Sequence, residues 1–308
     1  MILTITANPT VDRVYFVDKF EMGEVHRPER MVYSAGGKGL NVARVAHIIG
    51  EEASAMGFVG GFNGEYIKSE LQKIGIKTDF TQVDGETRVC VNISDSKGLS
   101  GEILEKGPVV TQKQVEEFLK AFENCVDNYN IVCASGSLPQ GVDSSFYCEI
   151  IRVSRAHNKR VIVDASGKVL EDVIEAKPFM IKPNRYELSL LMRKEISSLE
   201  DVKEALIFLH KKGIALPLIT LGGDGAMAYI DGEFYKFNSP KVVVKNTVGS
   251  GDSTVAGIAT GLRRGMSVID SIKLGMACGT ANTQFEETGI VSQELVEKYY
   301  KEVTVEKL

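Results

Sequence analysis

Short apolar runs alternate with helical patterns along most of the chain. Each run is separated from the next by a helical or mixed stretch. Strands that are buried on both faces read as continuous apolar runs, and their alternation with helices is typical of a parallel sheet covered on both sides. We therefore expect an α/β fold with a doubly wound, mainly parallel sheet. The runs are "ILTIT" (2–6), "ASAMGFV" (53–59), "IVCASGS" (131–137), "RVIVDAS" (160–166), "FMIKPN" (179–184) and "LPLITLG" (216–222).

Two segments depart from this rhythm, at about 11–34 and 85–107. In the second, Val89, Val91 and Ile93 alternate with more polar positions, and a turn is expected near "SKGLSG". A period of two is that of a half-exposed strand. We expect these segments to form a small antiparallel β-sheet that lies outside the main sheet as a lid.

From about residue 250 the pattern changes to helices. The stretches "STVAGIATGLRRG" and "SVIDSIKLGMACGTANTQF" are dense in alanine and glycine, which favours close helix packing. The chain shows no repeat, linker or low-complexity segment. We expect residues 1–308 to form a single domain to which the two lid segments belong.

The composition narrows the class of protein. The chain has 308 residues, of which 44% are hydrophobic and 25% charged, and its net charge is -5. This is an ordinary globular composition without the basic excess that nucleic-acid binding needs. The five cysteines are scattered and form no CxxC pair, so neither a disulfide framework nor a zinc site is expected. Without a basic leader or an apolar run of about 20 residues, we expect a cytoplasmic protein.

The stretch "NTVGSGDST" (246–254) places glycines and a carboxylate where an apolar segment meets a helix. Gly249 and Gly251 can adopt backbone conformations that let successive N–H groups point into one concavity, where the helix dipole favours an anion. Asp252 has two readings at this stage. It either acts chemically beside that anion, or it caps the helix, a position that aspartate prefers.

Two further stretches carry candidate site residues. "AGGKGLNVARVAHIIG" sets Gly37, Lys38 and Asn41 around the start of a helix, where glycines admit a ligand and lysine supplies positive charge. A glycine-rich turn with a solvated lysine is the alternative. "IKPNRYE" places Asn184 and Glu187 on one face of a helix's first turn, which suits hydrated Mg²⁺ but also a simple cap.

Taken together, these motifs resemble the phosphofructokinase B branch of the ribokinase family. The resemblance runs through "TANPTVDR", "AGGKGLNVA", "SGSLPQG", "KPNRYE", "LGGDGA" and "VGSGDSTVAG", and so covers essentially the whole chain. It implies a ribokinase-like fold with a β-sheet lid, ATP-dependent phosphorylation of a sugar hydroxyl, and a homodimer formed through the lid.

The resemblance also implies roles for individual residues. Asp252 matches the catalytic base, and the backbone N–H groups of Gly249, Ser250, Gly251 and Asp252 would hold the transferring phosphoryl group. Residues that would bind the sugar are Asp12, Gly37, Lys38 and Asn41. On the nucleotide side, Lys182 and Asn184 would face the phosphates, Glu187 would orient hydrated Mg²⁺ together with Asn184, and Thr220, Gly222, Gly225 and Asn282 would contact ATP. Arg263 and Arg264 are expected at a solvated helix end.

The acceptor is expected to be a ketohexose phosphate. Arg88 lies on a lid strand where phosphosugar kinases of this branch carry a substrate-binding arginine, and Arg27 is a second candidate. The segments "TRVCVNI" and "GEILEKGP" resemble tagatose-6-phosphate kinases more than fructose-1-phosphate kinases, whereas "GFVGGFNGEYIK" resembles both. Two alternatives remain at this stage: a kinase of free sugars or nucleosides, and a noncatalytic regulator that binds the same ligands.

Overall fold

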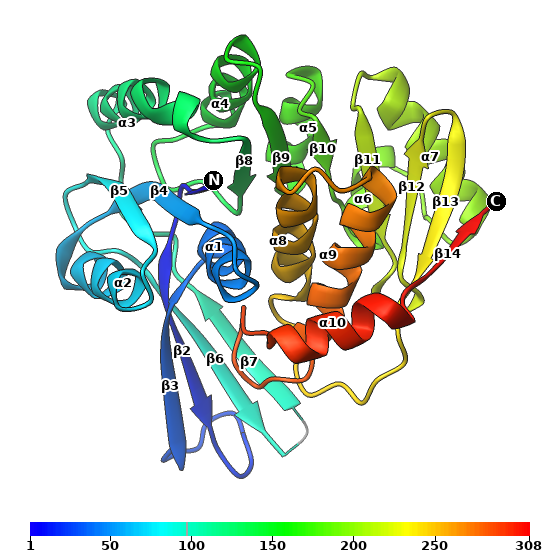
Figure 1. The fold of residues 1–308 in the computed structure, drawn as a ribbon. Helices are drawn as coiled ribbons and strands as arrows, with labels where there is room; N and C mark the ends of the chain where they lie inside the picture. Colours follow the sequence, from blue (N-terminus) through cyan, green and yellow to red (C-terminus); the bar gives the residue numbers. More distant parts are fainter. Residues whose placement is uncertain (97) are drawn as a thin grey trace.

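The computed structural model describes residues 1–96 and 98–308, which form two sheets of very different size (Figure 1). The larger sheet has ten strands in the order β14-β13-β12-β11-β10-β9-β8-β1-β4-β5. Its strands, in chain order, are β1 (Ile2–Thr6), β4 (Ala53–Val59), β5 (Lys77–Gln82), β8 (Ile131–Ser135), β9 (Arg160–Asp164), β10 (Met180–Ile181), β11 (Leu216–Thr220), β12 (Ala226–Ile230), β13 (Glu233–Asn238) and β14 (Thr304–Lys307).

All pairings from β5 to β11 are parallel, which confirms the expected mainly parallel sheet. The six apolar runs of the sequence are β1, β4, β8, β9, β10 and β11. The sheet continues beyond β11 through three antiparallel pairings, to β12, β13 and β14, which the sequence pattern did not indicate.

Helices cover both faces of this sheet. Alternate strand residues point to opposite sides, so that Ile2 packs in one core with α1, α8 and α9, while Leu3 packs in the other with α3 and α4. In Figure 1, α1, α8, α9 and α10 lie on one side and α3 to α7 on the other. The helices are α1 (Lys38–Ile48), α2 (Gly61–Lys73), α3 (Gln112–Cys125), α4 (Ser145–Ala156), α5 (Gly167–Glu175), α6 (Arg185–Met192), α7 (Leu199–Lys211), α8 (Ser250–Arg263), α9 (Val268–Asn282) and α10 (Gln293–Glu302).

The close packing expected between the last apolar helices is present. A Cβ atom on Gly257 of α8 would lie 2.6 Å from the carbonyl oxygen of Leu274 in α9. Only glycine allows the two backbones to approach so closely. The end of α8 corrects one expectation, because Arg263 and Arg264 are not simply solvated. Their Nε atoms lie 2.8 and 3.5 Å from the carboxylate oxygens of the buried Glu51.

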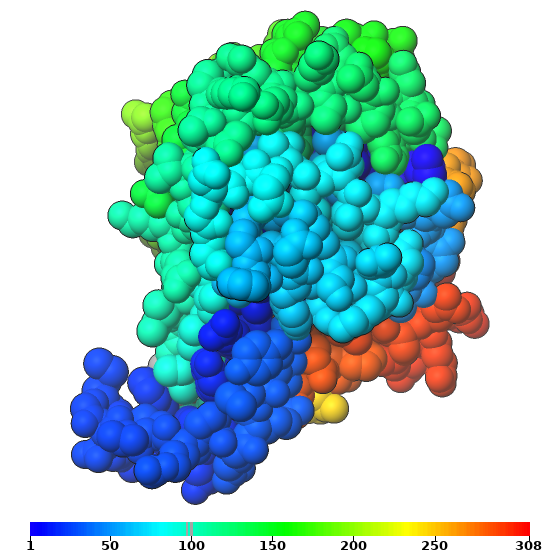
Figure 2. All heavy atoms as spheres, turned by 90° about the vertical axis from the view of Figure 1, so that its left-hand side faces the viewer, coloured from blue at the N-terminus to red at the C-terminus, as the bar shows by residue number. Residues whose placement is uncertain are grey.

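The smaller sheet is the lid, and it projects from the body as a separate lobe (Figure 2). Its strands are β2 (Thr10–Phe16), β3 (Arg30–Gly36), β6 (Val89–Asp95) and β7 (Gly98–Leu104), in the order β3-β2-β6-β7. The outer pairings are antiparallel, but β2 and β6 run parallel, which corrects the expectation of a purely antiparallel lid. The turn expected near "SKGLSG" includes residue 97, which lies outside the described residues.

The direction of chain winding reverses beside β1. From β1 the chain first builds β4 and β5 on one side and then returns to build β8 to β11 on the other. In open α/β sheets, ligands bind at the carboxyl ends of the strands next to such a reversal. The fold therefore directs attention to the edge where β1, β8, β9, β10 and β11 end. Within the described ranges, no helix combines the length and the apolar character needed to cross a membrane.

Candidate active site

A cavity of about 850 Å³ lies at this edge, between the carboxyl ends of the strands, the lid and the N-terminus of α8. It is large enough for a sugar phosphate and a nucleotide together. Most of the site residues expected from the sequence line it: Asp12, Gly37, Lys38, Asn41, Arg88, Lys182, Asn184, Glu187, Thr220, Gly222, Gly225, Gly249, Ser250, Gly251 and Asp252. Arg27 and Asn282 do not line it.

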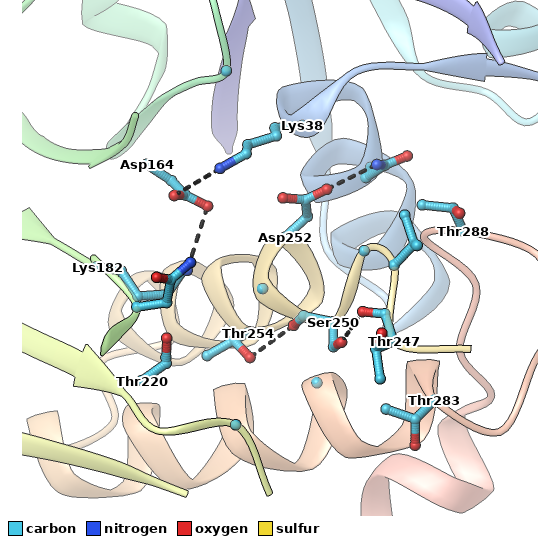
Figure 3. Close-up of a pocket in the computed structure, with 18 of the residues that line it drawn as sticks. Lys38, Asp164, Lys182, Thr220, Thr247, Ser250, Asp252, Thr254, Thr283 and Thr288 are labelled. Atoms are coloured by element: carbon cyan, nitrogen blue, oxygen red, sulfur yellow. Dashed lines mark hydrogen bonds and ion pairs between the residues drawn. The ribbon is translucent and has the colours of Figure 1, made fainter. Parts of the chain in front are cut away.

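Asp252 lies in the first turn of α8, and its side chain points toward α1 (Figure 3). It does not cap the helix, because the N-cap is Gly249 and no side chain accepts a cap hydrogen bond there. Instead, Oδ2 of Asp252 accepts a hydrogen bond from Nδ2 of Asn41 over 2.8 Å. Among the described residues, no hydrogen bond reaches Oδ1, and this oxygen is available to a ligand in the cavity.

Residues 249–252, at the start of α8, present backbone N–H groups close together; this segment is called the donor turn below. Gly249 has φ 82°, a left-handed conformation that favours glycine, and a Cβ atom there would lie 2.6 Å from Cγ2 of Thr288. In the described part of the chain, the N–H groups of Gly251 and Asp252 have no backbone acceptor. The N–H group of Ser250, by contrast, donates to the carbonyl of Thr247 over 3.2 Å. The helix N-terminus can thus bind an anion chiefly through Gly251 and Asp252.

The environment of Asp252 increases the affinity of its carboxylate for a proton. Burial raises the pKa of this carboxyl to about 6, and the negative charge of Asp164 acts in the same direction. Lys38, the hydrogen bond from Asn41 and Lys182 oppose the shift. A carboxylate with such a pKa is still largely ionised at neutral pH and is a better proton acceptor than an ordinary aspartate.

Asp164 is a site residue that the sequence analysis did not single out. It ends strand β9, is only 2% exposed, and receives two ammonium groups, Nζ of Lys38 at 3.2 Å and Nζ of Lys182 at 3.5 Å (Figure 3). Burial opposes ionisation of Asp164, but both lysines outweigh it and hold the pKa of this carboxyl below its ordinary value. Asp164 raises the pKa of Lys38 in turn. A signal was present in "VIVD", where a carboxylate directly follows a buried strand.

The two lysines that contact Asp164 reach the cavity from different elements. Lys38 begins α1, whereas Lys182 follows β10 and lies beside the donor turn. A Cβ atom on Gly251 would lie 3.2 Å from Nζ of Lys182. An anion held by the N-terminus of α8 would therefore also meet the ammonium group of Lys182.

The lid closes the cavity with its polar face. Asp12 of β2 and Cys90 of β6 are paired across the sheet, and both line the cavity together with Asn92, Glu102 and Leu104. Burial raises the pKa of Asp12 to about 6, although Arg88 and Arg44 lower it. Gly36 makes room for this carboxylate, since a Cβ atom at Gly36 would lie 2.0 Å from Oδ2 of Asp12.

Arg88 is anchored at the base of the lid. Its Nε and Nη2 atoms donate to the carbonyl of Asn8 at 3.2 and 2.9 Å, and Nη1 donates to the carbonyl of Glu105 at 3.1 Å. The guanidinium therefore lines the cavity in a fixed position. Arg27 is different, because it is exposed in the connection between β2 and β3 and does not contribute to the cavity of its own chain.

Most of the residues expected to face the nucleotide line the cavity, and two of them also cap a helix. Asn184 and Glu187 form a reciprocal cap of α6, with Oδ1 of Asn184 accepting from the N–H of Glu187 at 2.8 Å and Oε2 of Glu187 accepting from the N–H of Asn184 at 2.9 Å. Both also line the cavity. Thr220, Gly222 and Gly225 lie at the end of β11 and in the turn that follows, at the same edge.

Asn282 has a structural role instead of the expected contact with ATP. It is fully buried, and Oδ1 accepts hydrogen bonds from the N–H of Gly289 at 2.9 Å and from Oγ of Ser253 at 3.2 Å. Its Nδ2 donates to the carbonyl of Val248 at 2.8 Å. The side chain thus fastens the donor turn before α8 to the loop that follows α9.

The carboxylates of the site are compatible with hydrated Mg²⁺ but not with a closed metal cage. In the described part of the chain, no cluster of three or more His, Cys, Asp or Glu side chains could hold a metal ion. Oε2 of Glu187 accepts the cap hydrogen bond, whereas its Oε1 forms no hydrogen bond with those residues. Mg²⁺ commonly uses only one or two carboxylates and completes its shell with water and phosphate oxygens.

Comparison with known proteins places this geometry in a family. The profile of the pfkB family of carbohydrate kinases matches residues 5–294. The chain belongs to this family. Family membership makes it a carbohydrate kinase and implies that ATP is the phosphoryl donor.

Individual members of the family are similar over nearly the whole chain. A tagatose-6-phosphate kinase from Staphylococcus epidermidis is 38% identical over 308 residues, covering 99% of both chains. Phosphofructokinase-2 from Escherichia coli in complex with potassium superposes with a TM-score of 0.90 and 26% identity, covering 98% of both chains. A Thermotoga maritima protein described as a "possible 1-phosphofructokinase" superposes with a TM-score of 0.91 and 28% identity, covering 100% of this chain and 99% of its own.

Proposed function

We propose that this kinase phosphorylates a ketohexose phosphate to a ketohexose bisphosphate, with tagatose 6-phosphate as the preferred acceptor. The main support for phosphoryl transfer is the position of the Asp252 carboxylate. It lies beside the backbone donors of the α8 N-terminus and presents one oxygen to the cavity. The 38% identity to a tagatose-6-phosphate kinase supports the choice of acceptor. Fructose 1-phosphate is the alternative acceptor, favoured by the similarity to the Thermotoga maritima protein.

In the proposed reaction, Oδ1 of Asp252 accepts the proton of the attacking sugar hydroxyl. The N–H groups of Gly251 and Asp252, together with Nζ of Lys182, stabilise the negative charge on the transferring phosphoryl group. Phosphoryl transfer depends mainly on such positioning and fixed charge, because the protein contributes little covalent chemistry. Asp164 holds both lysines in place and prevents their repulsion before the anionic substrates bind.

The remaining residues of the cavity are assigned by position. Asp12, Gly37, Lys38 and Asn41 bind the sugar, and Arg88 binds the phosphate that the sugar already carries, because a fixed guanidinium recognises a phosphate well. Thr220, Gly222 and Gly225 contact ATP. Glu187, with Asn184, would hold hydrated Mg²⁺, which supplies charge neutralisation at the phosphates when it is bound. Arg27 does not line the cavity of its own chain, and we propose that it contributes to sugar-phosphate binding in the other chain of a dimer.

Parallel turnover assays test the proposal. ATP consumption with Mg²⁺ is compared on tagatose 6-phosphate, fructose 1-phosphate, fructose 6-phosphate and free fructose. A kcat/KM preference above about tenfold for tagatose 6-phosphate supports the assignment, and the same preference for fructose 1-phosphate selects the alternative. Turnover of free fructose alone would overturn the role of Arg88. Binding of the sugar phosphates without any turnover would show a noncatalytic regulator.

We further propose a homodimer formed through the outer face of the lid. Tyr33, Arg13, Val91 and Ile103 form one row across its four strands on the side opposite Asp12. In this row, Tyr33 is 45% and Ile103 61% exposed, an apolar surface that a second copy would cover. Light scattering checks this: Tyr33→Asp should lower the mass to that of a monomer. Phe62→Asp, at a residue 90% exposed on α2, is the control that should keep the dimer.

A further inference from the structure

Arg44 lies beneath the candidate active site, one helical turn after Asn41 in α1. It is only 9% exposed, and within residues 1–96 and 98–308 no carboxylate forms an ion pair with it, which is unusual for a buried arginine. Its Nη1 atom donates to Oδ1 of Asn41 at 3.0 Å and to the carbonyl of Thr288 at 3.3 Å, while Nη2 donates to the carbonyl of Ala35. One side chain therefore joins the lid, helix α1 and the loop after α9.

These contacts determine which way the Asn41 amide points. A guanidinium only donates hydrogen bonds, so the oxygen of Asn41 faces Arg44 and the NH₂ group faces the other way, toward Oδ2 of Asp252. The reversed amide would set two donors against each other at Arg44 and two acceptors against each other at Asp252. Arg44 thus excludes the orientation in which Asn41 could not donate to Asp252.

The pair of side chains is also enclosed. Gly289 covers it with φ 69°, and a Cβ atom at this position would lie 2.9 Å from Oδ1 of Asn41 and 3.0 Å from Nη1 of Arg44. The N–H of Gly289 is itself held by Asn282, which also fixes the donor turn. Hydrogen bonds in such an enclosed place are strengthened by the low local dielectric.

We propose that Arg44 is a positioning residue for phosphoryl transfer, which fixes the Asn41 amide and through it the carboxylate of Asp252. The inference rests on the proposed role of Asp252 as the base. Arg44 touches neither substrate in this arrangement. It acts by keeping a hydrogen bond on Oδ2 of Asp252, so that Oδ1 stays directed at the cavity and the carboxylate stays ionised.

Electrostatics support the same role. Burial lowers the pKa of Arg44, but Asp12 and Asp252 both stabilise its charged form. The positive charge of Arg44 therefore interacts with both carboxylates that are proposed to face the sugar. The hydrogen bond from Asn41 lowers the pKa of Asp252 against the effect of burial. When Arg44 is removed, the amide can turn away and this pKa should rise.

The test compares Arg44→Met with the unaltered enzyme on the sugar phosphate that the latter uses best. Methionine keeps much of the apolar stem and removes every donor. We expect kcat to fall by about tenfold or more, since small displacements of a catalytic group are costly. The acid limb of the pH profile, which is the pH range over which kcat/KM falls as the solution becomes more acidic, should move to higher pH. The KM for ATP should stay unchanged. Arg44→Lys should restore part of both effects, because an ammonium group can still donate to Oδ1 of Asn41.

A double-mutant cycle shows whether Arg44 acts through Asn41. In an Asn41→Ala background, Arg44→Met should add little to the loss of kcat, because the interaction that Arg44 supports is already absent. Arg264→Met is the matched control: this arginine also donates to a backbone carbonyl, that of Ile49 at 2.7 Å, but far from the site. It should leave the acid limb in place.

The results separate this inference from the proposed function. If Arg44→Met keeps the acid limb of the unaltered enzyme, or if the losses in the cycle are additive, the positioning role is overturned while the kinase assignment stands. If Asp252→Asn is as active as the unaltered enzyme, the base assignment itself fails. If Arg44→Met yields no folded protein, Asn41→Ala carries the test, because the proposed effect of Arg44 on Asp252 runs through the Asn41 amide. An acid limb that does not move to higher pH in that variant would equally overturn the proposal.

Discussion

Asp164 and Lys182 face each other from the carboxyl ends of neighbouring parallel strands, with Nζ of Lys182 3.5 Å from Oδ2 of Asp164. Both side chains are at most 5% exposed, so each charge depends on the other for stabilisation. Lys38 approaches the same carboxylate from α1. Asp164 therefore holds the ammonium groups of Lys38 and Lys182 next to the place where anionic substrates are proposed to bind. A first prediction follows from this arrangement.

Asp164→Asn should destabilise the protein and move the acid limb of activity to lower pH. Removing one partner of a buried ion pair typically costs about 3–5 kcal/mol. Because the charge of Asp164 raises the pKa of Asp252, its loss should lower that pKa. Urea unfolding and a pH profile of kcat/KM measure the two effects. Asp127→Asn is the control that should change neither, because this carboxylate is 71% exposed beside His157 and Lys159 and lies outside the cavity. A shift of the acid limb to higher pH would contradict the charge argument.

Asp252→Asn should separate activity from stability. Loss of a general base typically lowers kcat by about 10²- to 10⁴-fold. Stability at neutral pH should instead rise, by on the order of 1–3 kcal/mol, because a buried carboxylate whose pKa is raised to about 6 is replaced by a neutral amide. Single-turnover kinetics and urea unfolding of the same preparation check both parts. A variant that loses activity and stability together would indicate a structural role for Asp252.

The pH dependence of stability should run opposite to that of activity. The pKa values of Asp12 and Asp252 are raised to about 6 in the folded protein, from an ordinary value of 3.8. The folded state therefore holds these protons more tightly than the unfolded state, a contribution that is fully present below 3.8 and is lost as pH rises through about 6. Activity should increase over the same range, because Asp252 needs to be ionised.

The free energy of unfolding, compared with that of an Asp12→Asn, Asp252→Asn double variant, measures this contribution. The difference between the two proteins should widen as pH rises toward about 6 and then stay constant. A difference that is independent of pH would show that neither carboxyl has a raised pKa.

Gly249→Ala should lower kcat more than a glycine-to-alanine substitution at another position with a positive φ. Alanine with a positive φ costs about 1–2 kcal/mol, and here its methyl group would also lie 2.6 Å from Cγ2 of Thr288 and 2.9 Å from the N–H of Gly289. The donor turn would shift away from the phosphoryl group. Gly232→Ala is the matched control, with φ 86° and no atom within 4 Å of the added methyl. Equal kcat values for the two variants would argue against a catalytic turn at Gly249.

The sequence identified many of the residues that line the cavity, but not the contacts that these residues make with one another. Asp252, Lys38 and Asn41 belong to glycine-rich stretches that interrupt the alternation of strand and helix patterns. Such interruptions can be recognised in the sequence alone. The role of Asp164 depends on the register of β9 against β10, which brings it to Lys182, and on the start of α1, which brings Lys38. Such relationships arise only when distant segments pack together.

Asn282 and the lid illustrate two other limits. The amide of Asn282 is consumed by three hydrogen bonds to segments on either side of it, and no local pattern distinguishes a buried amide from one that faces a ligand. In the lid, alternation correctly indicated strands but carried no information on direction, so that the parallel pairing of β2 with β6 was not foreseen.

The alternation of β6 has a consequence for how this kinase can change over evolution. Cys90 and Asn92 line the cavity, while Val91 between them belongs to the outer row of the lid. An insertion or deletion of one residue before Asn92 would exchange the two faces and present the outer row to the sugar. The register irregularity between β6 and β7 falls only beyond this point, at Ile93 and Ser94. Substitutions on the cavity face of this strand can therefore change the acceptor preference and leave the outer row in place, whereas a change of its length before Asn92 would alter both faces at once.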